Sequence, residues 1–198
     1  MAGVKRYDRT EILERAVDLF HRQGFNGTST AELVAELGVN RKSMYAEFGS
    51  KQELFEAALD QYNAKHLSAV LAAVEAIDAG PDSIRSTFEG FASASEDWAQ
   101  GRGCLLCNTA VERSALAEIG GNHVDAYFER LTTAFRNAVA NGQECGQIDS
   151  GADADELAAF FTMALIGVAA CAKGRADPLQ IHAACRVVFS VLESHRPH

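Results

Sequence analysis

Apolar residues recur three and four positions apart along nearly the whole chain, and no stretch shows the strict alternation typical of a half-buried strand. Breaks that contain glycine divide this pattern into segments of ordinary helix length. The pattern therefore predicts an all-α fold of about nine helices. We expect these helices at residues 12–23, 30–37, 41–48, 51–78, 82–99, 104–117, 122–141, 153–173 and 178–194.

Length and composition set the class of protein. With 198 residues, of which 47% are hydrophobic, the chain can bury a core without metal ions or disulfides. The N-terminus lacks the apolar core of a signal peptide, and the longest strongly apolar run, 157–172, is shorter than a typical membrane span. Five cysteines, an odd number, favour reduced thiols. We expect a cytoplasmic protein with no cofactor, no metal and no membrane partner.

The net charge of −9 is unevenly distributed. Residues 1–55 carry equal numbers of basic and acidic side chains, so the whole negative excess lies in residues 56–198. Basic residues also cluster within the first part, around Lys5 and at Arg41 and Lys42. A chain that is acidic overall is not typical of nucleic-acid binders, but such an asymmetry suggests two functions on one chain.

Residues 30–48 have the geometry of a helix-turn-helix, with two short helices around a tight turn that contains Gly38. In such modules the second helix enters the major groove of DNA. Met44 and Phe48 should face inward, which leaves the opposite side of this helix for guanine edges and phosphates. The residues expected to contact DNA are Thr28, Thr30, Asn40, Arg41, Lys42, Ser43, Tyr45, Ala46 and Lys51. The alternative is a generic three-helix corner with a solvated basic face.

A longer stretch favours the DNA-binding interpretation. Residues Thr30–Leu54 resemble the N-terminal domain of the TetR/AcrR transcriptional regulators, and the most specific part is Tyr45, Phe48, Lys51 and Leu54 at intervals of three. This resemblance implies an all-helical repressor that binds double-stranded operator DNA as a homodimer and is released by a small-molecule effector. Asn40, Lys42, Ala46 and Glu47 depart from the residues usual in the family, which leaves the operator sequence open.

The same resemblance implies two domains. We assign residues 1–52 to a helix-turn-helix DNA-binding domain and residues 53–198 to an effector-binding and dimerisation domain. In this scheme the effector binds among the middle helices and shifts the long helix 51–78, which changes the spacing of the two reading helices.

A second, shorter segment falls where the effector pocket should begin. Residues 103–112 are similar to a Gly-Cys-Leu-Leu-x-Asn-x-Ala-x-Glu segment in one branch of the family. Ligand pockets between helices are lined by aromatic side chains and a few polar groups, although most aromatics belong to the core. The residues predicted to bind the effector are Phe88, Phe91, Trp98, Cys104, Asn108, Glu112, His123, Tyr127 and Phe161.

The last two helices have broad apolar faces and small residues that allow close approach. Two such hairpins can pair around a two-fold axis as a four-helix interface, or they can serve only the core of one chain. The resemblance favours the dimer. Its predicted residues are Phe160, Ala164, Val168, Ile181, Cys185, Val188, Phe189 and Leu192.

Two other functions stay open at this point. Cys104 lies near a predicted helix N-terminus, where the helix dipole favours the thiolate, and Cys107 lies on the same face, so a thiol-based redox or electrophile sensor is one alternative. An all-helical enzyme that uses Cys104 with His123 is a weaker one, because no catalytic spacing is recognisable.

Overall fold

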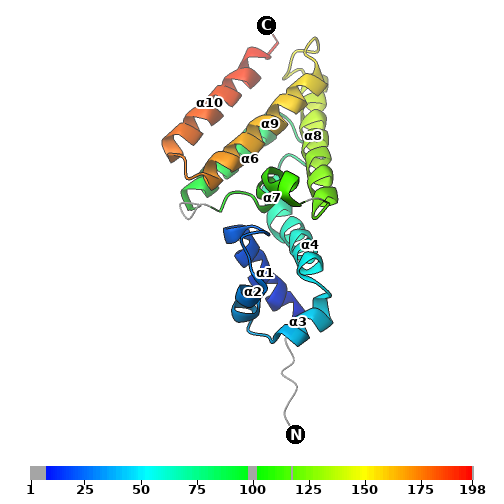
Figure 1. Ribbon diagram of the computed structural model, residues 1–198. Helices are drawn as coiled ribbons and strands as arrows, with labels where there is room; N and C mark the ends of the chain where they lie inside the picture. The colour runs from blue at the N-terminus through cyan, green and yellow to red at the C-terminus, as the bar shows by residue number, and fades with distance from the viewer. Residues whose placement is uncertain (1–7, 98–101, 117, 198) are drawn as a thin grey trace.

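The computed structural model describes residues 8–97, 102–116 and 118–197, and within these residues it contains helices and no strand. The predicted all-α fold is thereby confirmed. Figure 1 shows a small N-terminal group of helices at one end and a larger group, which ends in α10, at the other. The helices are α1 (Arg9–Gln23), α2 (Thr30–Leu37), α3 (Arg41–Phe48), α4 (Lys51–Tyr62), η1 (Asn63–Leu67), α5 (Ser68–Leu71), α6 (Pro81–Asp97), α7 (Leu105–Leu116), α8 (Gly121–Glu144), α9 (Ala154–Lys173) and α10 (Pro178–Ser194).

Local capping sets the boundaries of the N-terminal helices. Ser29 and Glu32 form a reciprocal capping box at the start of α2, and the side chain of Asn40 accepts a hydrogen bond from the Ser43 amide at the start of α3. Gly38 ends α2 with φ +66°, a left-handed conformation that favours glycine. The predicted bounds of both helices are confirmed.

The long helix predicted over 51–78 is interrupted. Regular α-helix ends at Tyr62, a π-helix covers Asn63–Leu67, and turns follow the short α5. The Ser68 amide donates to the Asn63 carbonyl, five residues back. Arg130 of α8 hydrogen-bonds to the side chains of both Asn63 and Ser68. Because apolar residues keep a helical spacing through this segment, the sequence pattern does not show the interruption. Counted as one interrupted helix, α4, η1 and α5 bring the described helices to the nine predicted.

The C-terminal helices bury an aromatic core. The rings of Phe88 on α6, Phe135 on α8 and Phe161 on α9 pack together, with centroids 5.8–6.4 Å apart. By length and mean hydropathy (1.6), α9 is apolar enough to cross a membrane. Its contacts with α6, α8 and α10 explain this composition, because one side of α9 belongs to the core.

Helix α7 lies between the two groups of helices (Figure 1). It contacts α1 and α4 on one side and α8 and α9 on the other. The described structure therefore joins the N-terminal helices to the larger group through α4 and through α7.

Candidate nucleic-acid interface and effector pocket

Helix α3 presents one basic face to solvent. Arg41 and Lys42 are exposed, whereas Met44 and Phe48 are buried on the opposite side, at 1% and 6% exposure. Asn40 and Gly49 end the helix on either side, so eight residues of well-defined register carry this face. The expected inward orientation of Met44 and Phe48 is confirmed.

The aromatic ring of Tyr45 links α3 to the start of α2. Its hydroxyl lies 3.3 Å from the Thr30 hydroxyl, and the Arg41 guanidinium carbon lies 5.5 Å from the ring centroid. The hydrogen bond with Thr30 lowers the pKa of Tyr45. Thr30, Arg41 and Tyr45 thus contact one another, and side chains of these three types can all donate hydrogen bonds to a phosphate.

Lys51 is the first residue of α4. Its Nζ atom lies 4.1 Å from the centroid of the Phe25 ring, a cation–π contact that holds the chain in place. Partial burial lowers the pKa of Lys51. A cation at the first residue of a helix, beside amides that lack helical partners, suits a phosphate.

Two residues predicted to contact DNA have structural roles instead. Thr28 is 1% exposed and its hydroxyl donates to the Gly24 carbonyl at 2.7 Å, which closes the turn after α1. The structure therefore contradicts Thr28 as a DNA contact. Asn40 is exposed, but its side-chain oxygen already accepts from the Ser43 amide at 2.8 Å, so only the amide nitrogen is left for a further contact. Arg41, Lys42, Ser43 and Ala46 are exposed or partly exposed on α3, as expected.

A pocket of about 290 Å³ lies where α4, η1, α7 and α8 meet. Its rim carries a pair between His123 Nε2 and Asp60 Oδ1 at 3.0 Å, and Tyr127 is a buried wall. The lining is Asp60, Asn63, Leu106, Asn122, His123, Ala126, Tyr127 and Arg130. A second hollow of about 380 Å³ shares Ala126 and Arg130 with the first.

Only two of the residues predicted to bind the effector, His123 and Tyr127, line this pocket. Phe88, Phe91 and Phe161 are fully buried core aromatics, and Trp98 lies outside the described residues. The sequence reasoning missed the polar residues of α4 and η1. On α8 itself, Asn122, His123 and Arg130 recur on one side of the helix, a spacing that indicates a shared polar side but not its partners on α4 and η1.

Asn108 and Glu112 lie elsewhere, where α7 meets α1. The Asn108 amide donates to the Arg102 carbonyl at 2.7 Å, and the Glu112 carboxylate packs against Gly24 at the end of α1. Neither residue lines the pocket of about 290 Å³. The segment 103–112 joins the two groups of helices, and of its residues Leu106 lines the pocket.

The thiols of Cys104, just before α7, and of Cys107, in its first turn, are buried in the core. Cys104 and Cys107 are each 1% exposed, and their Sγ atoms lie 3.9 and 3.4 Å from the Tyr127 hydroxyl. A hydrogen bond with Cys107 lowers the pKa of Cys104, while the same bond and burial raise that of Cys107. Access decides the outcome here, because a buried thiolate cannot meet an oxidant. The redox alternative is therefore not favoured, and Cys104 does not line the pocket.

The predicted dimer residues divide into two groups. Ile181, Cys185, Val188 and Leu192 are buried within one chain because this face of α10 packs on α6 and α9, and Val168 is buried as well. The structure contradicts these five as dimer contacts. Phe160, 39% exposed, and the partly exposed Ala164 and Phe189 remain accessible. Because α10 has apolar residues on both sides, its sequence does not indicate which side faces the core.

An exposed apolar surface does exist on α9 and α10. Met163 and Val187 are 59% and 62% exposed, and a Cβ atom added at Gly167 would meet nothing within 4 Å.

Among the described residues no group of three or more histidine, cysteine, aspartate or glutamate side chains could hold a metal ion.

Comparison with known proteins agrees with this geometry. Residues 12–58 match the family model for bacterial regulatory proteins of the tetR family, and residues 80–188 match the tetracyclin repressor-like C-terminal domain. An uncharacterized HTH-type transcriptional regulator of Bacillus subtilis (strain 168), YezE, is 27% identical over 98% of this chain and 100% of its own length. The HTH-type transcriptional repressor ComR of Escherichia coli (strain K12) is 25% identical over 85% of this chain and 81% of its own.

A solved structure extends the comparison to a DNA complex. A cysteine mutant of the TetR family transcriptional regulator CifR, complexed with 26bp double-strand operator DNA, has a TM-score of 0.82 and 25% identity, and the match covers 95% of this chain and 98% of that chain. The two family models together span both groups of helices. This chain belongs to the TetR family of bacterial transcriptional regulators.

Proposed function

We propose that this protein is a ligand-responsive transcriptional repressor that binds a palindromic operator as a homodimer and leaves it when a small effector binds. The observation that carries the proposal is the face of α3, where Arg41 and Lys42 are exposed and Tyr45 is partly exposed, opposite the buried Met44 and Phe48. The chain is acidic overall, yet this face is basic, which is what a local electrostatic footprint on DNA requires. The operator complex of CifR and the repressor ComR support it.

The dimer forms through the exposed apolar face of α9 and α10. Phe160, Met163, Gly167 and Val187 present this face, and Gly167 leaves room for a helix of the partner to approach closely. A two-fold axis through such a four-helix interface places two copies of α3 on one side of the dimer. The half-sites then lie about one turn of DNA apart or somewhat more.

The effector binds in the pocket between α4, α7 and α8. Five polar side chains line it, Asp60, Asn63, Asn122, His123 and Arg130, so the effector is a small molecule with several hydrogen-bonding groups. Asp60 and Asn63 lie at the far end of α4 from Lys51, about 18 Å along a 12-residue helix. A ligand that moves this end of α4 therefore moves the DNA-binding end, and it acts only through different affinities for the two arrangements.

This function places the division between the two domains near residue 52 and the protein in the cytoplasm, where the DNA is. An enzyme is not supported. His123 pairs with Asp60 at the pocket rim, while Cys104 is buried beside Tyr127, so the nucleophile and base required by the enzyme alternative are not paired with each other.

The test is selection of duplexes from a random-sequence pool by the full-length protein, followed by binding titrations at several salt concentrations. We expect a palindromic consensus, a dimer on each duplex, and steep loss of affinity with salt. The double variant Arg41→Ala, Lys42→Ala is the matched control, since both side chains are exposed and should not affect folding. Recovery of no consensus, or equal binding by the double variant, would reject the proposal.

A further inference from the structure

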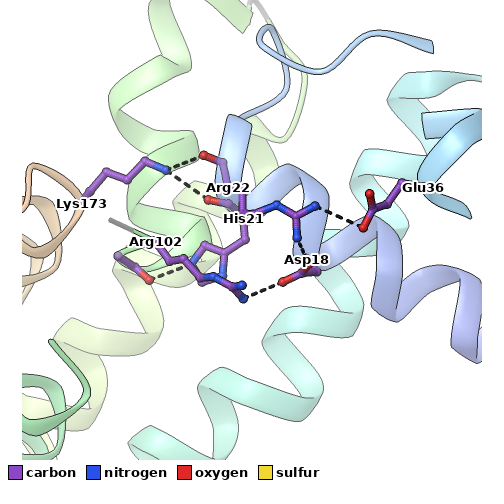
Figure 2. Close-up of polar contacts among 7 residues, drawn as sticks. Asp18, His21, Arg22, Glu36, Arg102 and Lys173 are labelled. Atoms are coloured by element: carbon purple, nitrogen blue, oxygen red, sulfur yellow. Dashed lines mark hydrogen bonds and ion pairs between the residues drawn. The ribbon is translucent and has the colours of Figure 1, made fainter. Parts of the chain in front are cut away.

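The C-terminal end of α1 is held by the effector domain through polar contacts (Figure 2). His21 is 9% exposed and its Nε2 atom lies 2.7 Å from the Gly103 carbonyl, so Nε2 carries the proton and donates. Arg102 donates to Asp18 at 2.6 Å. These contacts join α1 to the segment that leads into α7.

Lys173, at the end of α9, adds a third link. Its ammonium lies 3.1 and 3.2 Å from the carbonyls of His21 and Arg22, two of the carbonyls that lack partners at the end of a helix (Figure 2). A cation at this end also complements the dipole of α1. The end of α1 is thus fastened to two different elements of the effector domain.

The Gly103 carbonyl is itself held firmly from the effector side. Gly103 has φ +61°, and a Cβ atom there would lie 2.9 Å from the Ala169 carbonyl oxygen and 2.9 Å from Lys173 Cβ. On the neighbouring residue, the Arg102 carbonyl accepts from Asn108. Because α9 lies too near for any side chain at Gly103 and Asn108 of α7 binds the adjacent carbonyl, we infer that this backbone moves with α7 and α9.

The same end of α7 reaches the effector pocket. Leu106 lines the pocket, and Cys107 lies 3.4 Å from the hydroxyl of Tyr127, which is a pocket wall. Leu106 is therefore only three positions along the chain from Gly103, whose carbonyl binds His21. This route to α1 runs beside α4, whose last residue, Tyr62, packs on the His21 ring with 5.2 Å between centroids.

We propose that the His21–Gly103 hydrogen bond is a positioning contact, through which displacement of the first turn of α7 by an occupied pocket is transmitted to α1 and hence to the DNA-binding domain. The inference rests on the proposed function for its biological meaning. In physical terms, filling the pocket should change the stability of the C-terminal end of α1 by a coupling free energy. That coupling can be measured without knowledge of the effector.

The experiment fills the pocket with a side chain. Ala126 is exposed on α8 and lines both hollows, so Ala126→Trp places an indole at the pocket without disturbing the core, and Asn122→Trp does the same from a second rim position. Hydrogen exchange is read at the Gly24 amide, which donates to the Phe20 carbonyl at the end of α1. We expect either filler to change this exchange rate about tenfold in the full-length wild-type dimer.

His21→Leu removes the donor, and in that background the filler should leave exchange at Gly24 unchanged. His21→Gln keeps an N–H donor and should restore the response. Glu36→Gln is the matched control, because it breaks the Arg22–Glu36 pair, which stays within the DNA-binding domain, and the response should persist (Figure 2). An equal response in His21→Leu and wild type, or no response to either filler in wild type, overturns the inference.

Affinity for the selected duplex, measured on the same proteins, separates this inference from the proposed function. If the fillers change exchange at Gly24 through His21 but leave affinity for DNA unchanged, the positioning contact stands and effector-driven release fails. If they weaken DNA binding equally in wild type and His21→Leu, release occurs by another route and the inference fails.

Discussion

Arg130 of α8 hydrogen-bonds to Asn63, the residue at which α4 changes into a π-helix, with 2.6 Å between Nη1 and the Asn63 side-chain oxygen. The same guanidinium lies 3.1 Å from the Ser68 hydroxyl just beyond the π-helix and pairs with Glu75. One side chain thus holds the segment on both sides of the irregular turn. Short π-helical segments occur frequently at functional sites, and this one borders the effector pocket.

Arg130→Met should loosen this segment. We expect a loss of about 1–3 kcal/mol in the free energy of unfolding, because the hydrogen bonds involve a charged and partly buried group. Hydrogen exchange should also accelerate at residues 63–71. The control is Arg136→Met on the same helix, whose pair with Asp155 is exposed and should contribute less than about 1 kcal/mol. Equal effects of the two variants in urea unfolding would contradict the assigned role.

Lys51→Ala should weaken operator binding with little loss of stability. If Lys51 neutralises one phosphate, its removal lowers the slope of log affinity against log salt by about 0.9 per subunit. The measurement is fluorescence anisotropy on the selected duplex between low and moderate salt. Lys65→Ala serves as the control, since Lys65 pairs with Glu14 away from α3. An unchanged slope in Lys51→Ala would remove this residue from the interface.

Folding should become less favourable as the pH falls from about 6.5 to about 4, in part because of His21. Burial lowers the pKa of His21 from 6.5 to about 4. Between these pH values the unfolded chain binds a proton at His21 and the folded chain does not. The stability from this group is complete above pH 6.5 and is lost as the pH falls toward 4, by up to about 3 kcal/mol.

Burial outweighs the groups around His21, which act on its pKa in both directions. The hydrogen bond with the Gly103 carbonyl and the charge of Asp18 favour an imidazolium, whereas Lys173 and Arg102 oppose it. The ring of Tyr62 packs on the imidazole with 5.2 Å between centroids. Urea unfolding at pH 4.5, 5.5 and 7 measures the effect, and His21→Gln should flatten the dependence. The same steepness in both proteins would assign the acid sensitivity to other groups.

Val187→Glu should dissociate the dimer and leave the fold intact. Val187 is 62% exposed, so a carboxylate there is solvated in the free chain and unpaired in an apolar interface. Ile181→Ala, at a position 4% exposed, should instead lower stability by about 2–5 kcal/mol. Sedimentation velocity and thermal unfolding distinguish the two. A dimeric Val187→Glu protein would place the interface elsewhere.

Thiol labelling should separate the five cysteines by exposure. Cys145 is exposed and should react quickly with a disulfide reagent, whereas the buried Cys104, Cys107 and Cys185 should react only after unfolding. Cys171 is exposed in the single chain and should become reactive in the Val187→Glu protein if the dimer covers α9. Mass spectrometry of the labelled protein checks the order, and rapid labelling of Cys104 would reopen thiol sensing.

The candidate sites divide by how local their causes are. The DNA-binding face was predictable, because capping by Ser29 and Asn40 and the inward spacing of Met44 and Phe48 depend on neighbours within a few residues. The effector pocket was mostly not, because it joins residues of three helices whose packing no local pattern specifies. His123 was found, while its partner Asp60, distant in the chain, was missed.

By itself the sequence determined the helices and the reading face of α3, since helix periodicity and end signals act within a few turns of the chain. Tertiary packing decided which apolar side of α10 is buried, where α4 changes into a π-helix, and that Asn108 and Glu112 lie where α7 meets α1. In each of these cases alternatives of similar local free energy exist, and contacts between residues far apart in the chain select one of them.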